Sequence, residues 1–189
     1  MNRSIRYFTA AAAMTACFGM TVFPDEAKAE AKKQVQLQNP ISMLVVDTDK
    51  NGTNVRETPR GKIIATIPYA AKNAPDKVLE SRQVEVLGQD GDWFKIRFDG
   101  EREGYMHKSV LGTCASATED GNPTFYAEPK DGGKTVGKRI PEGSFLRLEE
   151  VAAGDVDSWA RFSLAGKDIS GWLMPQATFS NPFSCNSWR

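Results

Sequence analysis

The residues of this chain that could do chemistry are few, and the first pair to consider is a histidine and a cysteine. His107 is the only histidine among 189 residues, and Cys114 is one of three cysteines. A thiolate activated by an imidazole is the pair that a cysteine hydrolase needs. No activated-nucleophile motif surrounds Cys114, and the sequence has no phosphate-binding loop or serine-nucleophile elbow. We therefore predict that the chain is not an enzyme, and we place a Cys-His hydrolase last among the alternatives.

Metal ligands are also scarce in this sequence. A single histidine and cysteines that are expected to pair leave too few ligands for a zinc site. The turn at 47–52 groups aspartates with an asparagine, but it lacks the glutamate that closes a calcium loop. We expect neither a metal nor a cofactor.

Two tryptophans flanked by cations are better candidates for a binding site. Side chains alternate between the two faces of a strand, so Trp93, Lys95 and Arg97 share one face, and Trp159 and Arg161 share another. A tryptophan beside cations can stack on a sugar or a proline while arginine meets a carboxylate. The alternative is that each indole packs under a loop, covered by aliphatic stems. These five residues are the predicted ligand-binding residues.

The segments that carry these tryptophans repeat one another along the chain, at 91–111 and at 157–175. In both, apolar residues recur with the period of two that is typical of a strand. Each tryptophan is followed at the same distance by a turn glycine, Gly100 or Gly166, which supplies the positive φ that a tight turn needs. The buried positions are predicted to be Phe94, Ile96 and Phe98 in the first segment and Ala160, Phe162 and Leu164 in the second.

Composition favours an all-β globular protein. Hydrophobic residues make up 40% of the chain and charged residues 25%, which is enough apolar content for a packed core. The 16 glycines and 10 prolines fall between short apolar runs, as they do in proteins with many short strands. The formal net charge is zero, which argues against nonspecific binding to nucleic acid or anionic lipid.

The N-terminus predicts export. Arg3 and Arg6 precede an uncharged run, and Ala27-Lys28-Ala29 has the small-x-small pattern of a signal peptidase site. We expect residues 1–29 to be a signal peptide cleaved after Ala29, with no stable membrane insertion afterwards, in a periplasmic or secreted protein. The alternatives are a retained anchoring helix, and a lipoprotein attached through Cys17.

Export changes the expectation for the cysteines. After cleavage only Cys114 and Cys185 would remain, and two thiols in an oxidising compartment usually pair. A Cys114–Cys185 disulfide would close a loop of roughly seventy residues and stabilise the fold by ~4 kcal/mol in the chain-entropy model. The alternative is two buried free thiols.

The order of turns and apolar runs divides the mature chain into two copies. We predict a flexible leader at 30–41, a first copy at 42–113, and a second copy with a C-terminal tail at 122–189. Tyr69–Arg82 is an insertion in the first copy without a counterpart in the second. Insertions of this kind go to surface loops, which often carry specificity.

The motifs of both copies resemble the bacterial SH3-like domain family, in its arrangement of two domains after a signal peptide. The resemblance covers about 42–177 of the chain and implies two tandem small SH3-like β-barrels. Tyr105 stands where the family usually has tryptophan, and the second copy lacks the Asn-Val-Arg motif. The matching stretches are Asn54-Val55-Arg56 with Pro59, Gly91-Asp92-Trp93 and 104–111 in the first copy, and Tyr126, Pro129, 140–143, Trp159 and Gly171-Trp172-Leu173 in the second.

The resemblance also implies a function. The family is associated with the bacterial cell envelope, where its members bind peptidoglycan or peptides without catalysis of their own. We accordingly predict a non-catalytic exported binding module whose barrels recognise a cell-wall glycopeptide or a peptide of an envelope protein. A periplasmic interaction or inhibitor subunit that makes contact through Tyr69–Arg82 is the alternative.

Overall fold

Strands dominate the part of the chain that the structure, a computed structural model, describes: residues 34–70, 82–117 and 121–174. One 3₁₀ turn, η1 (Lys108–Val110), is the one helical element there. The all-β prediction is confirmed. The strands are β1 (Gln34–Val45), β2 (Thr53–Arg56), β3 (Ile63–Ile67), β4 (Gln83–Asp90), β5 (Trp93–Phe98), β6 (Arg102–His107), β7 (Leu111–Cys114), β8 (Phe125–Tyr126), β9 (Thr135–Val136), β10 (Phe145–Ala153), β11 (Ser158–Leu164) and β12 (Ser170–Leu173).

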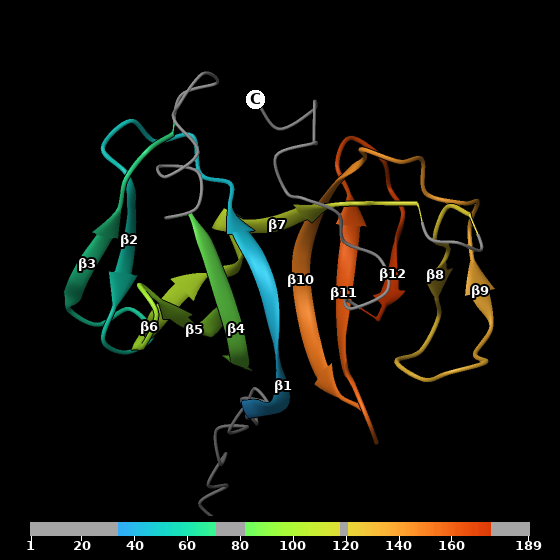
Figure 1. The fold of residues 1–189 in the computed structure, drawn as a ribbon, viewed down its shortest axis with the longest axis horizontal. Helices are drawn as coiled ribbons and strands as arrows, with labels where there is room; N and C mark the ends of the chain where they lie inside the picture. Colours follow the sequence, from blue (N-terminus) through green and yellow to red (C-terminus); the bar gives the residue numbers. More distant parts are fainter. Residues whose placement is uncertain (1–33, 71–81, 118–120, 175–189) are drawn as a thin grey trace, which may run out of the picture. The chain divides into compact units, whose positions relative to one another are not determined.

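All these strands belong to one twelve-stranded sheet, in the order β3-β2-β6-β5-β4-β1-β7-β10-β11-β12-β8-β9 (Figure 1). Read outward from the middle, β1-β4-β5-β6-β2-β3 matches β7-β10-β11-β12-β8-β9 strand for strand. We call β1 to β6 the first repeat and β7 to β12 the second repeat. They join where β1 pairs antiparallel with β7, through Leu44 with Gly112 and Val45 with Leu111.

The two repeats also share their register. Trp93 pairs with Asp90 in the first, as Trp159 pairs with Ala152 in the second. In both hairpins the strand before the tryptophan contains a bulge at the same distance from it. The structure thus places the two tryptophan segments on strands that correspond residue by residue.

A glycine occupies the equivalent position in β6 of the first repeat and β12 of the second. Gly104 pairs with Ile96, and Gly171 pairs with Phe162. A Cβ atom at Gly104 would lie 2.5 Å from Cγ1 of Val55, and one at Gly171 would overlap Cβ of Phe125. Any other residue would push β6 away from β2, or β12 away from β8, which explains the glycine before the aromatic residue in both copies.

The core runs through both repeats without a break. The predicted alternation is confirmed, because the six apolar positions of the two tryptophan segments are all buried. They belong to one contiguous cluster that also includes Leu37 and Leu111. Two separate SH3-like barrels are therefore not shown: the strands form one sheet over one cluster, inside the compact unit Lys32–Arg189.

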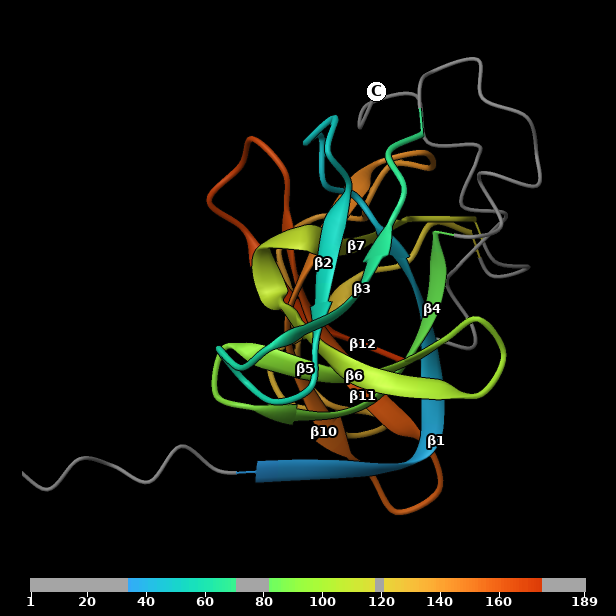
Figure 2. The ribbon, with the colours of Figure 1, turned by 90° about the vertical axis from the view of Figure 1, so that its left-hand side faces the viewer.

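The predicted flexible leader at 30–41 is wrong from Gln34 onward. β1 starts there and pairs with β4 from Gln34 opposite Asp90 to Leu44 opposite Gln83. Leu37 and Ile41 are buried along it. The strand bends where its register shifts between Gln36 and Ile41, as Figure 2 shows. The polar sequence hid this strand because part of its length borders a polar groove rather than the core.

The predicted boundary between the two copies is shifted, and the predicted signal peptide and tail cannot be compared with the structure. β7 (Leu111–Cys114) pairs with β10 as β1 pairs with β4, so by strand order the second repeat begins with β7, before the predicted boundaries at 113 and 122. The predicted signal peptide, with Cys17, and the tail at 175–189 lie outside the described residues. Within residues 34–70, 82–117 and 121–174, no helix is long and apolar enough to cross a membrane.

A buried arginine holds the base of the predicted insertion, most of which lies outside the described residues. Arg82 is 1% exposed, and its Nε and Nη2 atoms donate to the carbonyl oxygen of Val45 at 2.8 and 2.6 Å. Nη1 donates to Pro68 at 2.9 Å, and Nη2 also donates to Asp47 at 2.8 Å. Burial lowers the pKa of Arg82, while the charges of Asp47 and Tyr69 oppose that shift. Nothing in the sequence analysis pointed to this residue.

Candidate functional site

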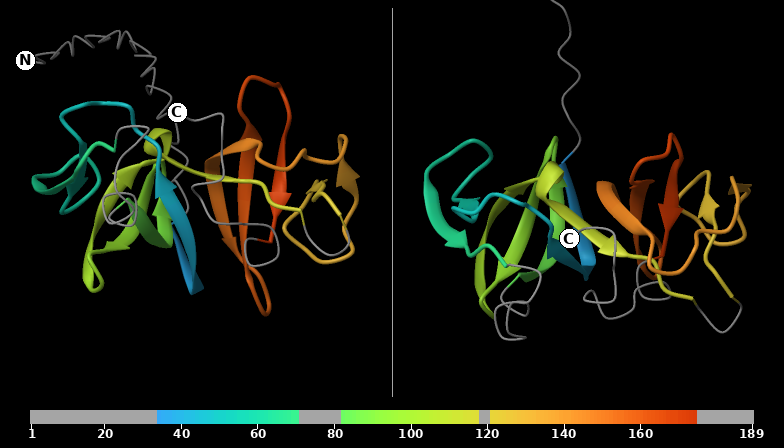
Figure 3. Two further views of the ribbon diagram at one scale, coloured as in Figure 1. Left: turned by 45° about the horizontal axis from the view of Figure 1, so that its top comes forward. Right: turned by 90° about the horizontal axis from the view of Figure 1, so that it is seen from above.

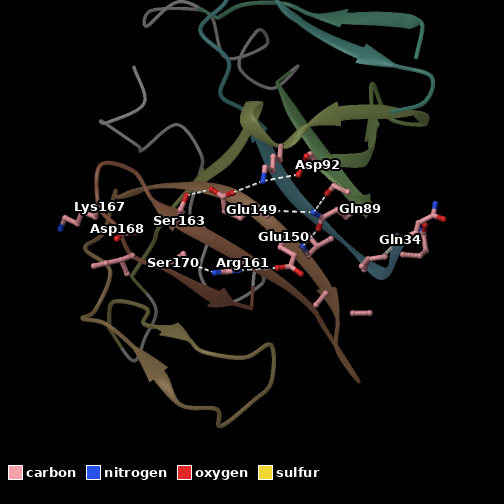
Figure 4. A pocket seen from close by; sticks show the side chains of 18 residues that line it. Gln34, Gln89, Asp92, Glu149, Glu150, Arg161, Ser163, Lys167, Asp168 and Ser170 are labelled. Carbon is pink, nitrogen blue, oxygen red and sulfur yellow. Dashed lines mark hydrogen bonds and ion pairs between the residues drawn. The ribbon is translucent and has the colours of Figure 1, made fainter. Parts of the chain in front are cut away.

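A polar groove of about 800 Å³ lies between the two repeats (Figure 4). It borders the place where β1 and β10 run side by side (Figure 3). The first repeat contributes residues from β1, β4 and the β4–β5 turn, η1 contributes Lys108, and the second repeat contributes residues from β10, β11, β12 and the turn before β12. Its charged and amide-bearing lining residues are Gln34, Gln36, Gln89, Asp92, Lys108, Glu149, Glu150, Arg161, Lys167 and Asp168.

The bulge in β10 sets the chemistry of this groove. Leu148 and Val151 are both buried although they are three residues apart, so Glu149 and Glu150 both face away from the core. In a regular strand these two neighbours would point to opposite faces. The bulge leaves Glu149 without a register partner while Glu150 pairs with Arg161. As a result, two adjacent carboxylates line one wall of the groove.

Glu149 is held by groups from both repeats. The Ser163 hydroxyl donates to its Oε1 atom at 2.7 Å. Lys108 Nζ lies 3.8 Å from its Oε2 atom and 3.5 Å from Oδ1 of Asp92. Lys108 therefore bridges a carboxylate of each repeat, as the dashed lines of Figure 4 show.

Glu150 and Arg161 form a second polar pair on the same wall. Arg161 Nη1 lies 3.8 Å from Oε2 of Glu150, and Nη2 donates to the Ser170 hydroxyl at 3.2 Å. The acidic lining residues are Asp92, Glu149, Glu150 and Asp168, against Lys108, Arg161 and Lys167, so four negative and three positive groups leave one negative charge in excess.

Gln89 crosses the groove from the first repeat to the second. Its Oε1 atom accepts the backbone N–H of Val151 at 2.9 Å. Its Nε2 atom donates to the carbonyl of Gly91 at 2.7 Å and lies 3.5 Å from the carbonyl of Glu149. The side-chain amide of β4 thus satisfies the backbone of β10 at the bulge.

The first group of predicted ligand-binding residues lies outside this groove. Trp93 is half-buried, and its ring meets the edge of His107 at a centroid distance of 5.4 Å. Lys95 Nζ lies 2.6 Å from Glu103, and Arg97 Nη1 lies 2.8 Å from Glu85. The hydrogen bond from Lys95 lowers the pKa of Glu103. Both cations already have carboxylate partners on their own sheet face.

The second group is split by the structure. Trp159 is only 3% exposed and packs edge-on against Tyr126 at 5.7 Å, so its ring has no free face for a ligand. This is the packed arrangement that the sequence analysis held as the alternative for each indole. Arg161 lines the groove, unlike the other four predicted residues. The glutamate doublet between Leu148 and Val151 was the missed signal, because it interrupts the alternation of a strand.

His107 and Cys114, the two residues of the considered Cys-His pair, each make structural contacts. His107 ends β6, its Nδ1 atom lies 2.9 Å from the Ser109 hydroxyl, and it accepts the Ser109 N–H at 3.3 Å. Cys114 is fully buried and disulfide-bonded. Cys185 lies outside the described residues, so its pairing with Cys114 stays a prediction.

The expectations of no enzymatic activity and no metal also stay predictions. Within the described ranges, no group of three or more histidine, cysteine, aspartate and glutamate side chains could hold a metal ion.

Comparisons with known proteins give little that resembles this chain. No family model matches it, and no curated protein matches it. Two similar solved structures are NlpC2 and NlpC1 from Trichomonas vaginalis, with 13% and 14% identity and TM-scores of 0.31 and 0.32. They cover 76% of this chain, which spans about half of their length, 49% and 47%. At such TM-scores the likeness establishes neither a fold nor an activity, and membership of the SH3-like family stays a prediction.

These neighbours nevertheless correct the functional prediction. Both similar structures are named as NlpC proteins, and neither is named as a non-catalytic module for cell-wall or envelope peptides. The predicted module recognised its ligand through the faces of Trp93 and Trp159. We therefore set that prediction aside, together with the interaction-subunit alternative.

Proposed function

We propose that the groove between the repeats binds a small polar ligand that carries an ammonium group, and that Glu149 and Glu150 hold this group. The observation that carries the proposal is the bulge, which puts two neighbouring carboxylates on one groove wall. Bulges recur next to binding sites because they re-aim side chains. The equivalent bulge in the first repeat, at Leu87 and Gly88 of β4, carries no charged side chain.

The two carboxylates keep acceptor capacity for a ligand. An ionised carboxylate offers about four acceptor positions. Ser163 occupies one position on Glu149, and the distances of 3.8 Å from Lys108 to Glu149 and from Arg161 to Glu150 exceed hydrogen-bond length. The excess negative charge of the lining favours a cationic ligand over an anionic one. A groove of about 800 Å³ is within the range of small-molecule sites.

The proposal places this binding outside the cytoplasm. The predicted signal peptide at 1–29 supports export, and the disulfide at Cys114 fits an oxidising compartment.

Calorimetric titration with 1,5-diaminopentane tests the proposal, with 1,5-pentanediol as a neutral probe of the same length. We expect saturable binding of the diamine, which weakens as salt is added, and no binding of the diol. Glu149→Gln and Glu150→Gln should each weaken diamine binding about tenfold, the value of a charge-assisted hydrogen bond.

Glu101→Gln is the matched control, because Glu101 is exposed in a turn of the first repeat and is not part of the groove lining. Its affinity for the diamine should equal that of the wild type. The proposal fails if the diamine does not bind, or if both groove variants bind it as well as the control does.

A further inference from the structure

The first repeat shows what covers the outer edge of a bulged strand in this fold. Next to the bulge of β4, the edge is covered by the start of β1, with Gln34 opposite Asp90, Val35 opposite Gln89 and Gln36 opposite Gly88. An extended chain, with its regular amide groups, therefore sits on this edge in the first repeat.

Within the part of the chain that the structure describes, the corresponding edge of the second repeat has no such chain. β7 takes the place of β1, but it pairs with β10 only through Phe145, Leu146 and Arg147, and so ends before the bulge. Among the described strands, none pairs with 149–153 on that side, since β11 lies on the other. These residues form the wall of the groove instead.

Gln89 takes the position that the missing chain would fill. A primary amide can present an N–H donor and a carbonyl acceptor on the same side, so one group can meet both an N–H and a C=O of a strand edge. Its acceptor meets the Val151 N–H at 2.9 Å, whereas its donor lies at the long distance of 3.5 Å from the Glu149 carbonyl. The same Nε2 atom has a shorter bond, 2.7 Å, to Gly91 of its own repeat. Gln89 can therefore give up the β10 edge and keep its stronger partner.

We propose that the edge of β10 from Glu149 to Val151 is an amide-recognition subsite, and that the ligand of the groove is an amine that also carries a primary amide. The ligand carbonyl accepts the Val151 N–H in place of Gln89, and the ligand N–H donates to the Glu149 carbonyl. Glu150, the residue between them, lies next to this subsite for the ammonium group. This inference rests on the proposed function, since both use the same groove.

Two probes that differ in the amide donor test the inference by calorimetric titration: 6-aminohexanamide, a primary amide, and its N,N-dimethyl derivative, a tertiary amide that lacks the N–H. The wild type should bind the primary amide about three- to tenfold more tightly than the tertiary amide, as expected for one hydrogen bond. In Gln89→Ala the primary amide should gain a further few-fold, because the competing side chain is gone.

Gln83→Ala is the matched control, since Gln83 lies on the same strand and bonds Ser42 away from the groove. It should leave the ratio between the probes unchanged. Amide hydrogen exchange of Val151 in the wild type gives a readout that needs no variant: the primary amide should slow it more than the tertiary amide does.

The outcomes separate this inference from the proposed function. If the diamine binds but the two amide probes bind equally and leave Val151 exchange alike, the amide subsite is refuted and Gln89 is a purely structural clip. If the diamine does not bind but the primary amide is preferred, the subsite stands and the ammonium site is refuted. If Gln89→Ala weakens both probes equally, Gln89 does not compete with the ligand.

Discussion

The bulged hairpins of the two repeats have the same register and different side chains. In β4 the bulge falls at Leu87, which is 5% exposed, and Gly88 follows it in close contact with the Val35 carbonyl. In β10 the equivalent residues are Glu149 and Glu150, which line the groove. Both repeats have the same backbone irregularity, while its side chain is buried in the first repeat and lines the groove in the second.

The start of each repeat differs in a related way. The N–H of Val45 donates to the carbonyl of Arg82, and the N–H of Ala115 donates to the carbonyl of Ser144, both at 2.9 Å. The backbone bond is the same, but only Arg82 adds a buried guanidinium that binds three carbonyl oxygens. This comparison shows that the repeats share main-chain geometry and differ in how the ends of strands are fixed.

Replacing Arg82 by the residue of the second repeat should have the largest effect. Arg82→Ser removes the guanidinium that donates to the carbonyl oxygens of Val45, Asp47 and Pro68. It should lower the free energy of unfolding by about 3 kcal/mol, since buried acceptors lose their partners. Denaturant titration measures it. A loss below about 1 kcal/mol would mean that water replaces the guanidinium at no cost.

Exchanging the bulge residues should have a large effect in one direction only. Leu87→Glu puts a carboxylate in a buried position and should cost about 2–3 kcal/mol of unfolding free energy. Glu149→Leu places an apolar group in a solvated groove and should cost less than about 1 kcal/mol, but it should weaken diamine binding. Thermal unfolding and calorimetry together check both changes. Equal costs would show that the two bulges have similar environments.

The equivalent glycines should respond alike. Gly104→Ala and Gly171→Ala each place a methyl group against the adjoining strand and should each cost about 1–3 kcal/mol, the range for overpacking. Denaturant unfolding of the two variants is the measurement, and Gly100→Ala in an open turn separates steric overlap from the strain of positive φ. A large difference between Gly104 and Gly171 would contradict the correspondence of the repeats.

The smallest expected effect is a pH dependence that Glu103 of the first repeat should contribute. Glu103 and Ser170 occupy equivalent positions, and Glu103 bonds Lys95. Because the folded pKa of Glu103 is lowered, its contribution is present above the usual glutamate pKa of 4.5 and is lost as pH falls through the folded pKa. The pair is exposed, so the contribution should stay below about 1 kcal/mol.

Glu103→Gln should flatten the stability profile below pH 4.5, the ordinary glutamate pKa. Unfolding at a series of pH values tests this, with Glu101→Gln as the exposed control. An unchanged acid limb in Glu103→Gln would show that the ion pair does not contribute to stability.

The parts of this fold that the sequence predicted are those decided by local pattern. The alternation around Trp93 and Trp159 identified both hairpins, because each strand has one face on the core. The start of β1 escaped notice, since the glutamines at 34 and 36 border the groove and show no apolar period. Arg82 was missed because its three acceptors come from residues distant in sequence.

The candidate site was hidden for a different reason. Lys108 precedes β7 and Glu149 lies far along the chain in β10, and the pairing of β7 with β10 helps to bring their side chains within 3.8 Å. When each copy is considered alone, its sequence favours the aromatic and cationic residues of its own hairpin as the binding site. Of the residues it selected, Arg161 lines the groove and Trp159 is packed inside.

The short ladder between β1 and β7 has a consequence for how the chain avoids sticking to itself. A strand at the border of a sheet is a template for further strands, and proteins must blunt or hide it. Here the end of β1 and the start of β7 cover each other, and one of the two end strands of the sheet is β9, which is only two residues long. Separating the copies would expose the paired ends of β1 and β7 at once, so their pairing lowers the risk of aggregation.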